Sequence, residues 1–153
     1  MIDESIEVEV PTRTAYNQWT QFEDFSKFME GVESVKQIDD KRLHWIAEIG
    51  GKRREWDAKI VEQAPDQRIA WKSTAGEMHS GVVTFHTLDD NRCRIMLQME
   101  YDPKDFAEKA ADALGLVRHR VKGDLERFKE FIEERGKETG AWRGEISQEK
   151  KAG

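Results

Sequence analysis

The side chains with the clearest chemical potential are three tryptophans and one arginine in the middle of the chain. Trp45, Trp56 and Trp71 fall on the inward-facing positions of alternating segments. Indole rings either wall a pocket for a ring-containing or lipid-like molecule or fill a core that is short of aliphatic residues. Arg54 lies two residues before Trp56 and is therefore expected to point to the same face of the strand. Its guanidinium is predicted either to enter the end of such a pocket, where it would bind a carboxylate, enol or headgroup, or to lie at a solvated hairpin end.

Two hydroxyl side chains on inward positions extend this candidate site. Ser73 and Tyr101 would each contact a ligand or, as the alternative, bond to a backbone carbonyl. The residues predicted to line a ligand cavity are Trp45, Arg54, Trp56, Trp71, Ser73, Phe85, Met99, Tyr101, Leu114, Val117 and Val121.

Signals for metal binding and nucleophilic catalysis are weak. The four histidines, His44, His79, His86 and His119, show no ligand spacing such as HExxH, so neither a metal nor a cofactor is expected. His79 is placed in the connection between Gly76 and Gly81, as part of a mouth loop. The chain has no G-x-S-x-G elbow, P-loop or G-x-G-x-x-G motif, and it offers no catalytic residue that can be assigned.

The single cysteine, Cys93, stands between Arg92 and Arg94, which would lower its pKa. A lone cysteine in a strand is more typical of a small apolar filler. One cysteine allows no intramolecular disulfide, and the acidic, alternating start of the chain is unlike a signal peptide. These features favour a cytoplasmic location.

Composition narrows the class of protein further. The chain has 153 residues with 25 Lys+Arg against 31 Asp+Glu, a net charge of −6, which argues against a general nucleic-acid binder. The basic run at 118–122 is followed at once by acidic residues and is interpreted as a solvated helix face. No apolar run approaches the ~18 residues of a membrane span, so no integral membrane association is expected.

The elements that would hold these residues follow from hydrophobic periodicity. A strand with period two ends at Pro11, and one or two short helices follow over 12–29. Six short strands with turn signals between them then fill 32–101 and are expected to form an antiparallel meander. Val32–Ile38 alternates irregularly, which suggests a bulge. A long amphipathic helix is predicted over 103–135, with Asp102 as N-cap and Gly136 at its end. The segment 136–153 is expected to be a polar, mobile tail, in which Trp142 docks on its own domain or contacts a partner or a second copy.

This order of elements resembles the helix-grip architecture of the START/Bet v 1-like superfamily. The stretches SIEVEVPTRTAYNQWTQFEDFSKFMEGVESV, LHWIAEIGGKRREWDAKI and DQRIAWKS look like the bacterial polyketide cyclase/dehydrase-type branch of that superfamily. The resemblance covers about 2–135 and implies an α+β fold: a curved antiparallel sheet of about seven strands around a long C-terminal helix, with two short helices after the first strand. Residues 1–135 would form this domain.

The resemblance also implies a cavity between sheet and helix that holds an apolar or amphipathic small molecule, such as a lipid, an isoprenoid quinone or a polyketide-like aromatic. Binding is therefore the preferred function. An aromatase/cyclase-like enzyme that folds a polyketone chain is the first alternative. A protein-interaction module acting through the C-terminal tail is the second. Fold alone does not decide among them.

Overall fold

One antiparallel sheet forms the frame of the molecule. The computed structural model describes residues 2–49, 51–76, 78–102 and 110–147, with only the backbone described at 49, 76, 78, 101, 102 and 110–114. The sheet order is β1-β7-β6-β5-β4-β3-β2. The strands are β1 (Ile2–Val8), β2 (Val32–Gln37), β3 (Arg42–Ile49), β4 (Lys52–Ala64), β5 (Arg68–Gly76), β6 (Met78–Asp89) and β7 (Arg92–Asp102). This confirms the predicted sheet of about seven strands, in which β2 to β7 form the six-strand antiparallel meander and β1 pairs with β7.

Alternation of side chains gives the sheet one apolar and one polar face. In β4, Arg54, Trp56 and Ala58 are buried, whereas the residues at 53, 55 and 59 are exposed. Trp45 of β3 lies directly opposite Trp56 in the register of the two strands. The predicted bulge is present in β2, where the register with β3 shifts between Val32 and Ser34.

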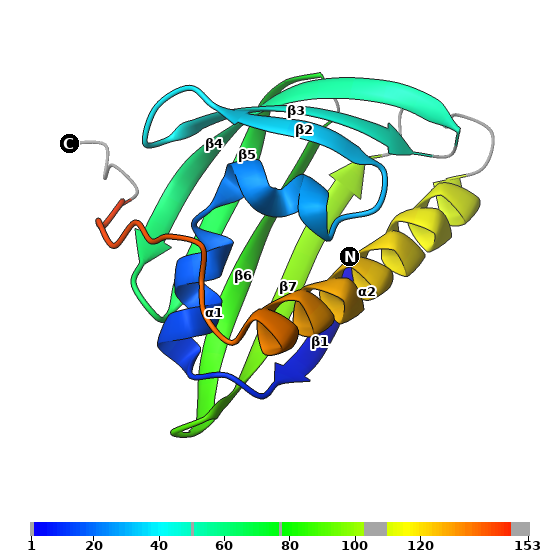
Figure 1. The fold of residues 1–153 in the computed structure, drawn as a ribbon. Coiled ribbons are helices and arrows are strands. Elements are labelled where there is room, and N and C mark those ends of the chain that lie inside the picture. The colour runs from blue at the N-terminus through cyan, green and yellow to red at the C-terminus, as the bar shows by residue number, and fades with distance from the viewer. Residues whose placement is uncertain (1, 50, 77, 103–109, 148–153) are drawn as a thin grey trace.

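Three helices lie on the concave side of the curved sheet (Figure 1). They are α1 (Thr12–Trp19), the short 3-10 helix η1 (Phe22–Lys27) and α2 (Ala110–Arg135), which runs diagonally across the open side of the sheet. The predicted start of the long helix at Asp102 and Pro103 lies outside the described residues. Its predicted end is confirmed: Gly136 has φ 75° and donates its N–H to the carbonyl of Ile132 at 2.8 Å. A left-handed residue of this kind commonly terminates a helix.

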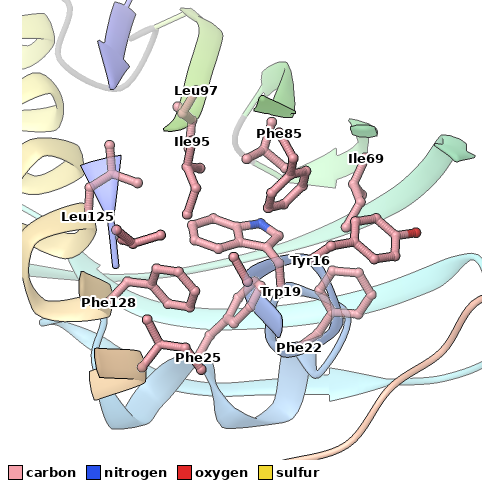
Figure 2. Packing of buried hydrophobic residues seen from close by; sticks show 14 of the residues in the cluster. Tyr16, Trp19, Phe22, Phe25, Ile69, Phe85, Ile95, Leu97, Leu125 and Phe128 are labelled. Carbon is pink, nitrogen blue, oxygen red and sulfur yellow. The ribbon is translucent and has the colours of Figure 1, made fainter. Parts of the chain in front are cut away.

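The core is aromatic and is centred on Trp19. Figure 2 shows its indole between Phe25 of η1, Phe85 of β6 and Phe128 of α2. The Trp19 and Phe128 ring centroids lie 4.9 Å apart at 78°, an edge-to-face geometry, and Phe128 is fully buried. The two short helices are thereby fixed between the sheet and α2.

The position of His79 differs from the sequence prediction. The connection proposed over 76–81 is instead mostly strand, because β6 begins at Met78 and His79 pairs with Tyr101 of β7. The polar sequence around His79 lacks an alternating apolar signal, and cross-strand hydrogen bonding extends the strand regardless. The prediction of a mouth loop at this residue was therefore wrong.

The described part of the tail, residues 136–147, is packed against the domain and is called the C-terminal strap below. It runs past α1 (Figure 1). Ile146 is buried and exchanges two backbone hydrogen bonds with Gln63 of β4, at 2.8 and 2.9 Å. Arg143 forms two hydrogen bonds to the Asp66 carboxylate at 3.0 and 2.7 Å. The mobility expected for 136–153 stays a prediction, while residues 136–147 make these specific contacts with the domain.

Trp142, within the strap, also contacts the domain. It packs, partly buried, on the aromatic core, and its backbone N–H donates to the Thr20 hydroxyl at 3.0 Å. This placement agrees with the interpretation that Trp142 docks on its own domain.

We expect Ile146→Ala to lower the free energy of unfolding by about 2 kcal/mol, because it removes a buried aliphatic side chain at the end of the strap. Glu145 is exposed, so Glu145→Ala is the matched control and should change stability by less than about 0.5 kcal/mol. Urea unfolding of both variants measures the difference. Equal stability of the two variants would contradict the docked strap.

Candidate functional site

A cavity of about 170 Å³ lies between the sheet, η1 and α2. Most of its wall is apolar, and the titratable side chains on the described wall are Glu30, His79, Arg120 and Asp124. The lining residues are Trp19, Phe22, Phe25, Met29, Glu30, Val32, Leu43, Trp45, Ala47, Trp56, Ala58, Ile60, Ile69, Trp71, His79, Leu97, Met99, Val117, Arg120, Val121, Asp124 and Leu125. An apolar hollow with a few polar groups is typical of a small-molecule site.

Six of the residues predicted from the sequence lie on this wall: Trp45, Trp56, Trp71, Met99, Val117 and Val121. Three others lie elsewhere. Phe85 is buried in the core, edge-on to Tyr16. Ser73 is buried, and its hydroxyl accepts the backbone N–H of His79 at 2.9 Å. The side chains of Tyr101 and Leu114 lie outside the described residues.

Arg54 is the third predicted residue that does not line the cavity. It is only 6% exposed, so of its two predicted placements the solvated hairpin end is wrong. Arg54 and Trp56 are both buried, which agrees with the prediction that they point to the same face of the strand.

The three tryptophans of the central strands all line the cavity. Trp45 and Trp56 are stacked across β3 and β4, with ring centroids 5.6 Å apart and planes at 11°. Trp71 of β5 covers Gly81 of β6, where a Cβ atom would lie 2.7 Å from the indole. Gly81 therefore leaves the space that the Trp71 ring occupies.

His79 joins this wall as a neutral imidazole. Its Nδ1 accepts the indole N–H of Trp71 at 3.1 Å, which places the ring proton on Nε2. Its ring stands edge-on to Trp56, with centroids 5.2 Å apart. Burial lowers the pKa of His79 to about 4, because the charged form would lose its hydration.

A polar clamp lies at the cavity wall where α2 meets the segment 28–31. Arg120 Nη1 donates to the backbone carbonyls of Glu30 at 2.6 Å and Glu48 at 3.1 Å. Asp124 accepts the backbone N–H of Glu30 at 3.0 Å and is also bonded to Arg127. Arg127 Nε donates to the carbonyl of Phe28 at 3.0 Å. We call Glu30, Arg120, Asp124 and Arg127 the mouth clamp.

Gly31 is required for this clamp. Its φ is 83°, and a Cβ atom there would lie 1.9 Å from Arg120 Nη1 and 2.7 Å from the Glu48 carbonyl. Only glycine combines the left-handed backbone with this close approach.

Asp124 is the most strongly perturbed carboxyl of the clamp. Burial raises its pKa to about 6, although hydrogen bonding to Arg127 acts in the opposite direction. Between about pH 4 and pH 6 the folded protein thus binds a proton that the unfolded chain does not. The free energy of unfolding contributed by this group therefore increases as the pH falls from 7 to 5.

We expect Asp124→Asn to remove this pH dependence. Wild type should gain about 1 kcal/mol relative to the variant between pH 7 and pH 5. Thermal unfolding of both proteins at the two pH values measures the difference. The pH dependence contributed by His79 has the opposite sign. Because its pKa is lowered in the folded state, stability decreases as the pH falls from about 6.5. His79→Asn therefore serves as the control. If the free energies of unfolding of wild type and Asp124→Asn differ by the same amount at both pH values, the raised pKa of Asp124 is contradicted.

Cys93 is a small buried core residue, as the sequence indicated. It is fully buried, and burial raises the pKa of its thiol to about 11, so a thiolate nucleophile does not form there at neutral pH. Within the described ranges, no group of three or more His, Cys, Asp or Glu side chains is placed to hold a metal ion. Likewise, no helix of the part that is described is long and apolar enough to cross a membrane.

Sequence reasoning missed the wall contributed by the short helices and the whole mouth clamp. Trp19, Phe22 and Phe25 follow one another at three-residue steps, which indicates a helix but does not distinguish a cavity wall from a filled core. Arg120 and Asp124 are charged residues next to the apolar stripe of the long helix, and this position is the only sequence signal they carry. Their partners are backbone groups about 90 residues away, which a sequence pattern does not show.

Solved structures share this fold. The aromatase/cyclase Zhui of Streptomyces sp. R1128 aligns over 92% of this chain and 98% of its own with a TM-score of 0.74 at 15% identity. A START superfamily protein of Mycobacterium smegmatis aligns over 82% of this chain and 97% of its own with a TM-score of 0.62, also at 15% identity. The curved seven-stranded sheet and the C-terminal helix are those of a START-type helix-grip fold, as predicted.

Sequence comparison defines the family. The family model for polyketide cyclase/dehydrase and lipid transport proteins matches residues 8–130. An uncharacterised 17.2 kDa protein of Streptomyces lincolnensis is 56% identical over 146 residues, which is 95% of this chain and 97% of that protein. The chain therefore belongs to the polyketide cyclase/dehydrase and lipid transport family, and the predicted resemblance is confirmed.

Proposed function

We propose that the protein binds an apolar or amphipathic small molecule in the cavity between the sheet and α2. The observation that supports this most is the wall itself, where four indoles and several aliphatic side chains surround about 170 Å³. Burial of a ligand there would gain about 25 cal/mol per Å² of apolar surface before ordering costs are subtracted. The family description, which includes lipid transport, agrees with this role.

A second candidate function is cyclase-like catalysis. One observation favours it: Asp124, on the cavity wall, has a pKa raised to about 6, within the range in which a carboxyl exchanges protons at neutral pH. The same carboxyl accepts the Glu30 N–H and bonds to Arg127, so it also has a structural role. The similarity in fold to an aromatase/cyclase is compatible with either function.

Native mass spectrometry of the purified protein tests the proposal, with a delipidated sample as the control. Binding predicts a retained apolar molecule that is removed by delipidation and rebinds unchanged in mass. A ligand that is released with the loss of water after incubation would favour the enzyme instead. No retained molecule, together with no binding of a neutral one- or two-ring apolar probe, would contradict the proposed function.

A further inference from the structure

The volume of the cavity limits which ligands it accepts. At about 170 Å³ it is close to the ~150 Å³ of an engineered apolar cavity that binds benzene, and below the ~300–1,000 Å³ of pockets for drug-sized molecules. We infer that the cavity selects an uncharged apolar molecule of one or two rings and discriminates against four-ring and long-chain molecules. This inference rests on the proposed function and adds the size class of the ligand.

The strand side of the cavity resists widening. Trp45 and Trp56 support one another in a cross-strand stack, and Trp71 is fixed between its hydrogen bond to His79 and the backbone beneath it at Gly81. Close-packed interiors do not deform continuously. A larger ligand would therefore have to displace several rings together.

The helix side is held by the mouth clamp. Arg120, Asp124 and Arg127 all bond to backbone groups of the segment 28–31, so α2 cannot move away from it without breaking these contacts. A molecule that extends toward the clamp must break it or project past its charged groups into water. In both cases an added ring contributes no further binding free energy from burial.

The same geometry disfavours charged ligands. The charged lining groups Glu30, Arg120 and Asp124 stand at the clamp and already contact protein partners. The remaining described wall is apolar apart from the neutral His79, so an ion within it would lose its hydration without compensation. A neutral polar substituent would lie at the clamp.

Three neutral alcohols with different bodies test the inference: 2-naphthol, 1-hydroxypyrene and dodecan-1-ol. Isothermal titration calorimetry with the full chain should give a dissociation constant for 2-naphthol at least tenfold below those of the other two. Equal or tighter binding of 1-hydroxypyrene or dodecan-1-ol would overturn the size limit while leaving the proposed function intact. If none of the three binds, the inferred size class is overturned, and if native mass spectrometry also finds no retained molecule, the proposed function is overturned as well.

A clamp variant tests the cause of the size limit. Arg120→Met keeps an apolar stem but removes both hydrogen bonds to the backbone, and we expect the preference for 2-naphthol over 1-hydroxypyrene to fall at least threefold. Arg118 is exposed on the same helix, so Arg118→Met is the matched control and should leave the preference unchanged. An unchanged preference in Arg120→Met, confirmed as folded by its thermal transition, would overturn the role of the clamp.

Discussion

Phe128→Ala is expected to lower the free energy of unfolding by about 3–5 kcal/mol. Phe128 is fully buried in α2, with its ring 4.9 Å from that of Trp19 and 5.1 Å from that of Phe28. Truncation would remove the side chain that joins α2 to Trp19 of α1 and to Phe28, the residue after η1. Close-packed neighbours would fill the resulting space only in part. The loss is a large fraction of the 5–15 kcal/mol that typically separates folded from unfolded domains.

Phe128→Leu separates the loss of volume from the loss of the aromatic ring. It retains most of the apolar volume and should cost less than about 1.5 kcal/mol. Urea unfolding with a common slope for all three proteins gives the comparison. A loss below about 1 kcal/mol in Phe128→Ala would contradict the central place of this residue in the core.

Filling the cavity is the second change with a large expected effect. Ala58 lies on its wall in β4 and is 1% exposed, so Ala58→Leu directs new methyl groups into the hollow. We expect binding of 2-naphthol to weaken at least tenfold. Stability should change by no more than about 1 kcal/mol, because the added side chain occupies empty space rather than forcing neighbours apart.

Ala70→Leu is the matched control for this variant. Ala70 follows Ile69 in β5 and points to the opposite face of the sheet, so the same substitution there should leave binding unchanged. Destabilisation of Ala58→Leu by several kcal/mol with undiminished binding would show that the space beside Ala58 is filled and is not the ligand site.

The frame was predictable from the sequence because local patterns determine it. Period-two alternation with turn residues identified the strands, and the apolar stripe that ends before Gly136 identified the end of the last helix. The inward parity of Trp45, Trp56 and Trp71 followed from the same alternation. These three residues do line the cavity, whereas their role in binding a ligand stays a prediction.

What the sequence did not predict depends on contacts between distant segments. The strap docks through a pairing of Ile146 with Gln63, and its polar composition indicates only a tail. His79 enters a strand because β7 is long enough to pair with it. Phe85 alternates like a wall residue but meets Tyr16 of α1, which fills the space in front of it. Each outcome follows from tertiary packing, which overrides the local signal.

The indole N–H signals of the tryptophans give the most direct test of ligand binding in the cavity. Four of the five tryptophans, Trp19, Trp45, Trp56 and Trp71, lie on the cavity wall, whereas Trp142 belongs to the strap and serves as an internal control. In a two-dimensional ¹H–¹⁵N spectrum recorded during addition of 2-naphthol, we predict that the four wall signals shift and saturate together while that of Trp142 stays in place. Unchanged wall signals, or a shift confined to Trp142, would contradict binding in this cavity.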